Sequence, residues 1–124
     1  MLSFMGRPEE AIGMAEKALR LNPRYPSLPL TVLGDAYYLT GRTEEAIATL
    51  KRSINASPHY LPSHVNLAAI YSELGREEEA RAEAAEILRI SPNFSLEVWR
   101  QKALYKDPAV GERMIAALRK AGLR

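Results

Sequence analysis

Apolar residues along the chain fall into short stripes at helical spacing, and turn residues separate the stripes. From Leu30 onward, apolar side chains recur every three or four positions until Gly41, a residue suited to the left-handed conformation that ends a helix. A second stripe follows Thr43, which can cap the first turn, and it stops before Pro58. Its apolar members are Ala46, Ile47, Leu50 and Ile54. The pattern predicts two helices joined by a tight turn.

The same arrangement returns at an almost fixed period. A glycine recurs along the chain and a proline follows each glycine 17 positions later, with steps of 35 and 34 residues in both series. The glycines are Gly6, Gly41 and Gly75, and the prolines are Pro23, Pro58 and Pro92. Periods of this length indicate stacked helix pairs, because one pair cannot bury its apolar face alone. Only five residues precede the first glycine, so the first unit lacks most of its opening helix.

The residues at the repeated positions carry a family resemblance. These positions hold Leu33-Gly34, Tyr37, Gly41, Ala46, Leu50 and Pro58, and then Leu67-Ala68, Tyr71, Gly75, Ala80, Ala84 and Pro92. The pattern resembles the tetratricopeptide repeat. This resemblance implies an α-solenoid in which Gly34 and Ala68 stand where the two helices of a pair approach closely. The aromatic residues that follow the prolines, Tyr25, Tyr60 and Phe94, are expected to pack into the junctions between repeats.

The segment after Pro92 leaves the repeat pattern. A short helix is expected from about Ser95, and a second one begins at Asp107-Pro108, where Asp suits the N-cap and Pro the first helical position. The apolar stripe of the second helix consists of Val110, Met114, Ile115 and Leu118. Gly122 suits its C-terminal cap. We expect this helix pair to cover the last repeat, as terminal units of repeat arrays do.

These elements define the expected fold: a single all-α domain over residues 1–124, a tetratricopeptide-type α-solenoid of antiparallel helix pairs with a C-terminal capping helix pair. It comprises a truncated first repeat (1–26), a second repeat (27–60), a third repeat (61–94) and the capping helices (95–124). The strings at residues 105–108 and 118–123 also resemble the C-terminal end of repeat regions attached to bacterial class III adenylate or guanylate cyclase-like proteins, and they are similar to the ends of some stand-alone repeat proteins. That resemblance implies that the chain is the C-terminal part of a larger signalling protein.

Composition removes several classes of site. The chain has no cysteine, which excludes disulfides and thiolate metal ligands. No apolar run approaches the roughly 20 residues that span a bilayer, and residues 1–5 lack the features of a signal peptide, so we expect a cytoplasmic protein. The net charge of +2 hides an asymmetry. Residues 1–95 carry 10 basic and 12 acidic side chains, whereas residues 96–124 carry 7 and 3.

The titratable residues do not indicate catalysis. His59 and His64 stand five positions apart with Pro62 between them, so they do not share a helix face as a metal-binding pair would. We expect His64 to be a packed or half-exposed side chain rather than a metal ligand. The acidic run Glu77, Glu78 and Glu79 suits the positive end of a helix dipole. The sequence therefore predicts no catalytic residue, no metal site and no cofactor, and hence a protein that is not an enzyme.

The resemblance also implies where a partner binds. In tetratricopeptide repeats the first helix of each pair lines a concave groove, and the positions of this sequence that match are Thr31, Asp35, Tyr38, Asn66, Ala69 and Arg100. Such a mixed surface suits an extended or helical peptide. One subfamily grips the C-terminal carboxylate of chaperones with lysines, asparagines and an arginine. Only Asn66 and Arg100 match that clamp, and Asp35 would repel a carboxylate, so we expect a different protein or peptide partner.

Two other surfaces are candidates for binding. The truncated first repeat leaves an apolar face that predicts a homodimer or cover by an upstream segment. That face consists of Leu2, Phe4, Met5, Ile12 and Leu19. The basic end suggests an alternative function, an accessory domain that contacts nucleic acid or an anionic membrane surface through Arg113, Arg119, Lys120 and Arg124. A solvated helix face also explains this charge, and the lack of interleaved aromatic residues disfavours nucleic acid.

Overall fold

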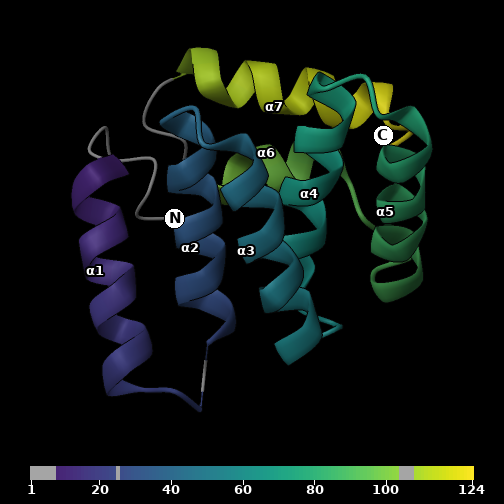
Figure 1. Cartoon of the computed structure of the whole chain (residues 1–124). Helices are drawn as coiled ribbons and strands as arrows, with labels where there is room; N and C mark the ends of the chain where they lie inside the picture. The colour runs from purple at the N-terminus through teal and green to yellow at the C-terminus, as the bar shows by residue number, and fades with distance from the viewer. Residues whose placement is uncertain (1–7, 25, 104–107) are drawn as a thin grey trace.

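The computed structural model of the chain describes residues 8–24, 26–103 and 108–124. In this part of the chain it contains seven α-helices and no strand (Figure 1). The helices are α1 (Pro8–Leu21), α2 (Ser27–Leu39), α3 (Thr43–Ala56), α4 (Leu61–Glu73), α5 (Glu77–Ile90), α6 (Leu96–Ala103) and α7 (Pro108–Lys120). Helices α2 and α3 form one packed pair, and α4 and α5 form the next. The prediction of an all-α solenoid is confirmed.

Glycines end α2, α4 and α7 in the same way. Gly41, Gly75 and Gly122 have φ angles of 84°, 78° and 109°, in the left-handed region that glycine adopts without strain. The residue after each glycine donates its backbone N–H to a carbonyl oxygen five positions earlier, as in the Schellman motif. These bonds join Arg42 to Tyr37 (2.7 Å), Arg76 to Tyr71 (2.9 Å) and Leu123 to Leu118 (3.2 Å). The three predicted C-terminal caps are confirmed.

The basic residues that follow Gly41 and Gly75 each cover an aromatic ring. The Arg42 guanidinium lies 5.6 Å from the centroid of the Tyr37 ring, and that of Arg76 lies 4.8 Å from the Tyr71 ring. Cation–π contacts of this kind are attractive because the ring face is electronegative. The recurrence of a basic residue after the glycine therefore has a structural explanation.

The start of α3 differs from the prediction. Thr43 is the first residue of the helix, and Arg42 occupies the N-cap position without a side-chain hydrogen bond. The expectation that Thr43 caps the first turn is therefore wrong. Glu44 and Glu45 lie in that turn, where the helix dipole favours negative charge.

Helices α2 and α3 approach each other closely at Gly34. A Cβ atom on Gly34 would lie 2.6 Å from Cγ of Leu50, which is fully buried. The predicted close approach at this glycine is confirmed. Leu50 belongs to a hydrophobic core that continues through α4 and α5 to α7, so α3, the third repeat and the C-terminal helices share one interior.

Helix α1 packs against α2 through its apolar stripe. Ala11, Ile12 and Ala15 form a second cluster with apolar residues of α2, and Leu19 packs against it. Ile12 is only 8% exposed and Leu19 is half-buried, so the expectation of an uncovered apolar face at these two residues is wrong. The rest of the expected self-association face, Leu2, Phe4 and Met5, lies outside the described residues. The exposed apolar side chains of α1 are Met14 and Leu21.

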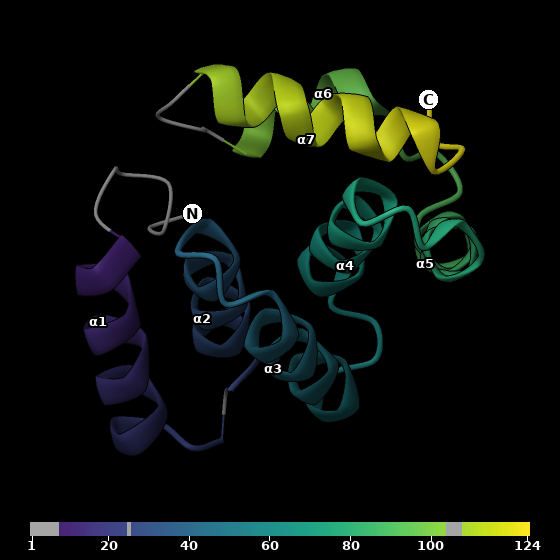
Figure 2. The same ribbon diagram turned by 45° about the horizontal axis from the view of Figure 1, so that its top comes forward.

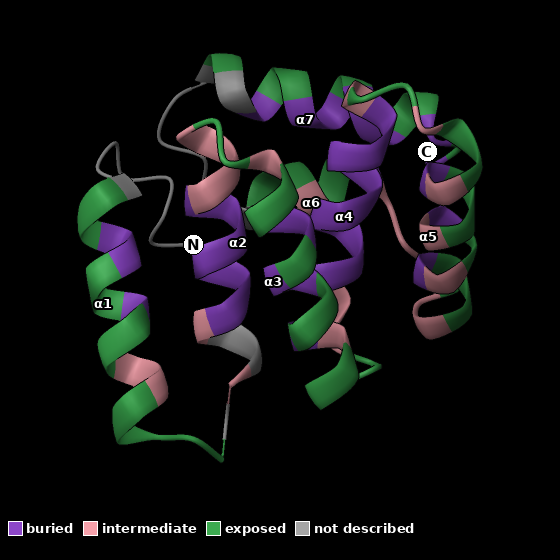
Figure 3. Cartoon of the chain, in the orientation of Figure 1, coloured by how far each residue is buried: buried purple, intermediate pink, exposed green. Residues whose placement is uncertain are grey.

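The C-terminal helices lie across the repeats. Figure 2 shows α6 and α7 as a layer over the open side of the arc formed by α1 to α5. Helix α7 packs against α4, and every residue of α4 from Ser63 to Ser72 is buried (Figure 3). A helix that is buried on all sides has neighbours all around it. Within the described ranges, no helix is both long and apolar enough to cross a membrane.

Candidate functional site

The first predicted groove residue, Thr31, faces the interior of the repeat stack. Its side chain is fully buried, and its hydroxyl lies 3.3 Å from that of Ser53 on α3 and 3.1 Å from that of Ser63 on α4. The Ser53 and Ser63 hydroxyls are also within hydrogen-bond distance of each other, at 2.6 Å. These three side chains form a polar junction where three helices meet. Thr31 therefore does not lie on an open surface.

The groove positions on α4 are also covered. Asn66 and Ala69 are fully buried, and Asp35 on α2 is 4% exposed. Ala69 belongs to the core cluster that contains the apolar stripe of α7. The prediction that these side chains line an accessible groove is wrong for this conformation, because α7 packs against α4 and the Thr31 hydroxyl of α2 lies between Ser53 of α3 and Ser63 of α4.

Asn66 differs from the other buried polar residues. Among the described residues, neither its side-chain oxygen nor its side-chain nitrogen has a hydrogen-bond partner. A buried amide without partners is costly, by about 1–3 kcal/mol in protein mutational data. The fold thus retains an unfavourable group on the concave side of α4.

Tyr38 is the groove residue with the most developed polar contacts. Its hydroxyl donates a hydrogen bond to the carboxylate of Glu73 on α4. Glu73 also pairs with Arg113 on α7 at 2.9 Å, and the Arg113 guanidinium lies 6.0 Å from the centroid of the Tyr38 ring. Burial, together with the Glu73 carboxylate, raises the pKa of the Tyr38 hydroxyl far above its ordinary value. The tyrosine therefore stays neutral and remains a hydrogen-bond donor.

Arg100 lies on α6 and contacts α7. It is exposed and pairs with Glu112 at 3.1 Å, with both side chains largely in solvent. Such a surface pair stabilises a fold by about 0–1 kcal/mol. Arg100 thus joins the two C-terminal helices, and the structure does not bring it into a shared cluster with Thr31.

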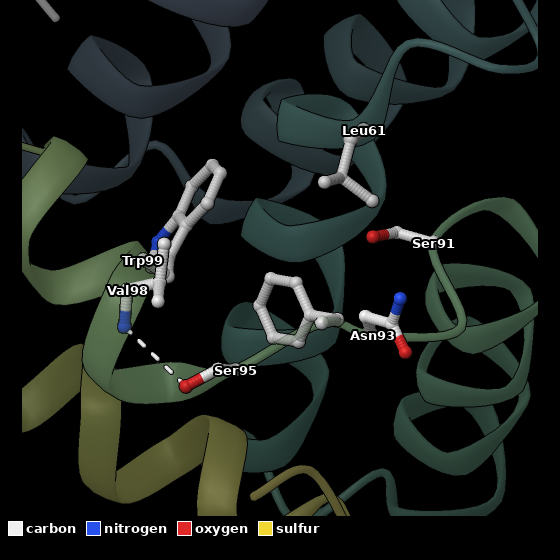
Figure 4. Close-up of a pocket in the computed structure, with 7 residues that line it drawn as sticks. Leu61, Ser91, Asn93, Ser95, Val98 and Trp99 are labelled. Carbon is white, nitrogen blue, oxygen red and sulfur yellow. Dashed lines mark hydrogen bonds between the residues drawn. The ribbon is translucent and has the colours of Figure 1, made fainter.

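A pocket that the sequence did not reveal opens at the junction of the third repeat and the C-terminal helices (Figure 4). Its volume is about 240 Å³, and its lining comprises Leu61, Ser91, Asn93, Phe94, Ser95, Val98 and Trp99. The rings of Phe94 and Trp99 lie 6.0 Å apart between centroids, at an angle of 46°. Both pack partly into the core, which confirms the expectation that Phe94 fills the junction after its repeat. The sequence feature that marks this junction is Phe94, the aromatic residue that follows Pro92.

His64 is a packed side chain, as the sequence predicted. It is 4% exposed, with Nδ1 2.7 Å from a Glu83 carboxylate oxygen on α5 and Nε2 2.8 Å from the Pro58 carbonyl oxygen. Because both nitrogens face acceptors, the doubly protonated imidazolium satisfies the site best. The hydrogen bond to Glu83 raises the pKa of His64, although burial opposes this effect. His64 therefore forms an ion pair inside the third repeat.

The basic residues of α7 and of the residues after it differ in their contacts. Arg113 pairs with Glu73, whereas Arg119 and Lys120 of α7 and Arg124 beyond it are exposed and have no ion-pair partner among the described residues. No cluster of three or more acidic or histidine side chains that could hold a metal ion occurs in the described ranges. The predicted basic surface is thus reduced to three free-standing side chains at the end of the chain.

Comparisons with known proteins identify the repeats. Two tetratricopeptide repeat models match residues 5–56 and 61–94. A barley (Hordeum vulgare) protein described as probable UDP-N-acetylglucosamine--peptide N-acetylglucosaminyltransferase SPINDLY is 32% identical over 75 residues, and the match covers 56% of this chain and 8% of the barley protein. The crystal structure of MamA superposes with a TM-score of 0.66 at 22% identity, covering 94% of this chain and 68% of the MamA chain. The MamA likeness concerns the fold.

Proposed function

Because this chain belongs to the tetratricopeptide repeat family, we propose that it is a protein-interaction module that binds a peptide or a partner domain on its concave side. Support comes from the pocket at the junction of the third repeat and the C-terminal helices. Apolar walls from Leu61, Phe94 and Trp99 and polar groups from Asn93 and its neighbours suit an apolar side chain carried by a hydrogen-bonding backbone. The match to the barley protein covers a small part of it, so its named activity is not carried to this chain.

The experiment places a photo-crosslinking amino acid at Val98, which lines the pocket and is 46% exposed. The matched control is Leu88 on the surface of α5, an apolar side chain with 42% exposure. We expect partner proteins to crosslink through position 98 and not through position 88. Equal crosslinking at both positions, or none at position 98, would contradict the proposal.

The wider context is also part of the proposal. The cyclase-like strings at residues 105–108 and 118–123 favour a larger cytoplasmic signalling protein in which this chain is the C-terminal part. The test is the full-length gene product: a cyclase domain upstream supports this context, and a gene that encodes no further domain contradicts it.

Self-association through α1 is a second proposal. The exposed residues that would mediate it differ from those expected from the sequence. Met14 and Leu21 are 58% and 67% exposed, and exposed apolar side chains that gather on one face mark interfaces. A dimer in light scattering that the double substitution Met14→Glu/Leu21→Glu dissociates would support this proposal. A monomer at all concentrations would exclude it.

The basic alternative has one favourable observation, the exposure of Arg119, Lys120 and Arg124. Binding through phosphate contacts falls steeply as salt rises, because each contact releases counterions. We therefore expect partner binding through the pocket to change little between low and physiological salt. If the affinity instead falls steeply as salt rises, and if this fall disappears when Arg119, Lys120 and Arg124 are replaced, the anion-binding function is favoured.

A further inference from the structure

Helix α7 shows what kind of surface the first helices of the repeats offer. Its buried side is an apolar stripe, and its other side carries charged residues in solvent. The stripe consists of Gly111, Met114, Ile115 and Leu118, and the buried Ala121 follows directly after the helix. This stripe packs against α4 within the shared core. The concave side of the repeats therefore accepts an amphipathic helix.

One basic side chain beside the stripe is recognised by both repeats. Arg113 pairs with Glu73 of α4 and lies over the ring of Tyr38 of α2, and the Tyr38 hydroxyl donates to the same Glu73 carboxylate. The Glu73 side chain is 18% exposed and that of Arg113 is 52% exposed. The acceptor is thus fixed and shielded on the repeats, whereas the cation reaches it from the solvent side. This arrangement fits any helix that presents a cation at the same place.

The stripe of α4 that carries Glu73 also carries the unsatisfied amide. Asn66, Ala69 and Glu73 are spaced i, i+3 and i+7, so they share one side of the helix. With α7 in place, both polar atoms of the Asn66 side chain lack partners among the described residues. The present arrangement therefore leaves a group that a polar side chain of another helix could satisfy.

From these contacts we propose that Tyr38, Asn66, Ala69 and Glu73 form a helix-binding surface, and that α7 occupies its Tyr38–Glu73 end within the chain. The partner is an amphipathic helix of another protein with a basic residue directly before one of the apolar residues of its stripe, as Arg113 precedes Met114 in α7. This proposal rests on the proposed function and specifies its partner. Because α7 is tethered, it competes at an effective concentration on the order of millimolar. A partner helix must exceed that competition, for example by hydrogen bonding to Asn66.

The experiment exchanges the charges of the recognised pair in the full chain. The probes are two fluorescent peptides of residues 108–124, one with the natural sequence and one with Arg113→Glu. The receptors are full chains with Arg113→Glu or Glu73→Arg, each of which repels its own α7. We expect the Arg113→Glu chain to bind the natural peptide about tenfold more tightly than it binds the altered peptide. The Glu73→Arg chain should show the reverse preference.

The control is Arg119→Glu, which changes an exposed charge on the outer side of α7. This chain should bind both peptides as weakly as the unmodified chain does. Hydrogen exchange of residues 108–120 should accelerate in the Arg113→Glu chain and stay unchanged in the control. Circular dichroism checks that all variants remain helical, which we expect because the Arg113 side chain is 52% exposed and that of Glu73 is not fully buried.

Three outcomes would overturn the proposal. The first is that neither variant discriminates between the peptides. The second is that the preference does not reverse between the Arg113→Glu and Glu73→Arg chains. The third is a dimer of the unmodified chain that exchanges α7 between copies, since the occupant would then be a second copy. Crosslinking through position 98 is independent of all three, so the interaction function and this inference can fail separately.

Discussion

In the helix pair α2–α3, Gly34 on the first helix faces Leu50 on the second, whereas Ala68 and Ala84 occupy the corresponding positions of α4–α5, 34 residues later. The first pair thus combines a glycine with a leucine at this contact, and the second pair combines two alanines. The polar positions differ too. Leu30 and Thr49 of the first pair correspond to His64 and Glu83 of the second.

The junctions that follow the two pairs also differ. Thr31, Ser53 and Ser63 make a buried hydroxyl cluster between the pairs. At the positions that correspond to Thr31 and Ser53, Val65 and Ile87 belong to the apolar core, and Glu97, which corresponds to Ser63, is exposed. The same backbone plan therefore supports either a polar or an apolar interior, provided that each set of contacting residues is complete. Substitutions that convert one pair into the other test this conclusion.

The largest effect is expected at the Gly34–Leu50 contact. Leu50→Ala removes a fully buried side chain and should lower the free energy of unfolding by about 2–5 kcal/mol. Gly34→Ala places a Cβ against Leu50 and should cost about 1–3 kcal/mol. In the double variant, which recreates the alanine pair of α4–α5, Gly34→Ala should cost nothing further, because the space beside it is now free. Urea denaturation measures all three.

Gly13 provides the control for this contact. It lies in the middle of α1 with nothing within 4 Å of an added Cβ. Gly13→Ala should therefore stabilise the chain by about 0.5–1 kcal/mol through helix propensity. If the costs at Gly34 and Leu50 simply add, the close approach of α2 and α3 does not explain the glycine.

The second effect concerns the ion pair of the third repeat. Removing one partner of a buried ion pair lowers the free energy of unfolding by about 3–5 kcal/mol. Because the Glu83 side chain is 17% exposed, we expect Glu83→Thr to lower it by about 2 kcal/mol. The double variant His64→Leu/Glu83→Thr installs the residues of the first pair. It should recover most of this loss, because no charge remains buried without a partner.

This ion pair should make stability depend on pH. The contact with Glu83 raises the pKa of His64 above 6.5, so folding favours the protonated form. The stabilisation is fully present below about pH 6.5 and is lost as the pH rises through the raised pKa. His64→Leu should abolish this dependence, whereas His59→Gln, at an exposed neighbour, should preserve it. An NMR titration that finds the pKa of His64 below 6.5 would contradict the assignment.

The smallest effect is expected at the two junctions. Thr31→Val removes one member of the hydroxyl cluster and leaves the Ser53–Ser63 contact, so it should cost about 1 kcal/mol. The reciprocal change, Val65→Thr, buries a hydroxyl in the apolar core and should cost about 1–2 kcal/mol. Thermal unfolding of both variants measures the difference. If Val65→Thr leaves the stability unchanged, this junction already contains a hydrogen-bond partner for the added hydroxyl.

Features that depend on local chemistry could be predicted from the sequence. The left-handed glycines follow from the end of each apolar stripe, and the start of α1 follows from Pro8 at a first helical position. The close approach at Gly34 follows from the small residue of the motif. Each of these features depends on a few neighbouring residues, and these residues recur at the same position of each repeat.

The arrangement of the C-terminal helices could not be predicted in the same way. A period describes how each unit packs on the next, but α6 and α7 are outside the period and their direction depends on the whole surface they bury. For that reason Asn66 and Ala69 were expected in an open groove and are found in the interior. The His64–Glu83 pair was detectable in principle, since both residues replace Leu30 and Thr49 at positions 34 residues earlier.

The return of α7 to α4 has a consequence for how the molecule unfolds. In a linear array each unit touches only its neighbours, so the ends open first and the array melts in stages. Here residues of α7 lie in the same core as α4, and Arg113 reaches as far back as Tyr38. Helices α2 to α7 should therefore open together in a single cooperative step. Helix α1, whose apolar residues cluster with those of α2 and not with this core, is then the terminus from which amide exchange spreads first.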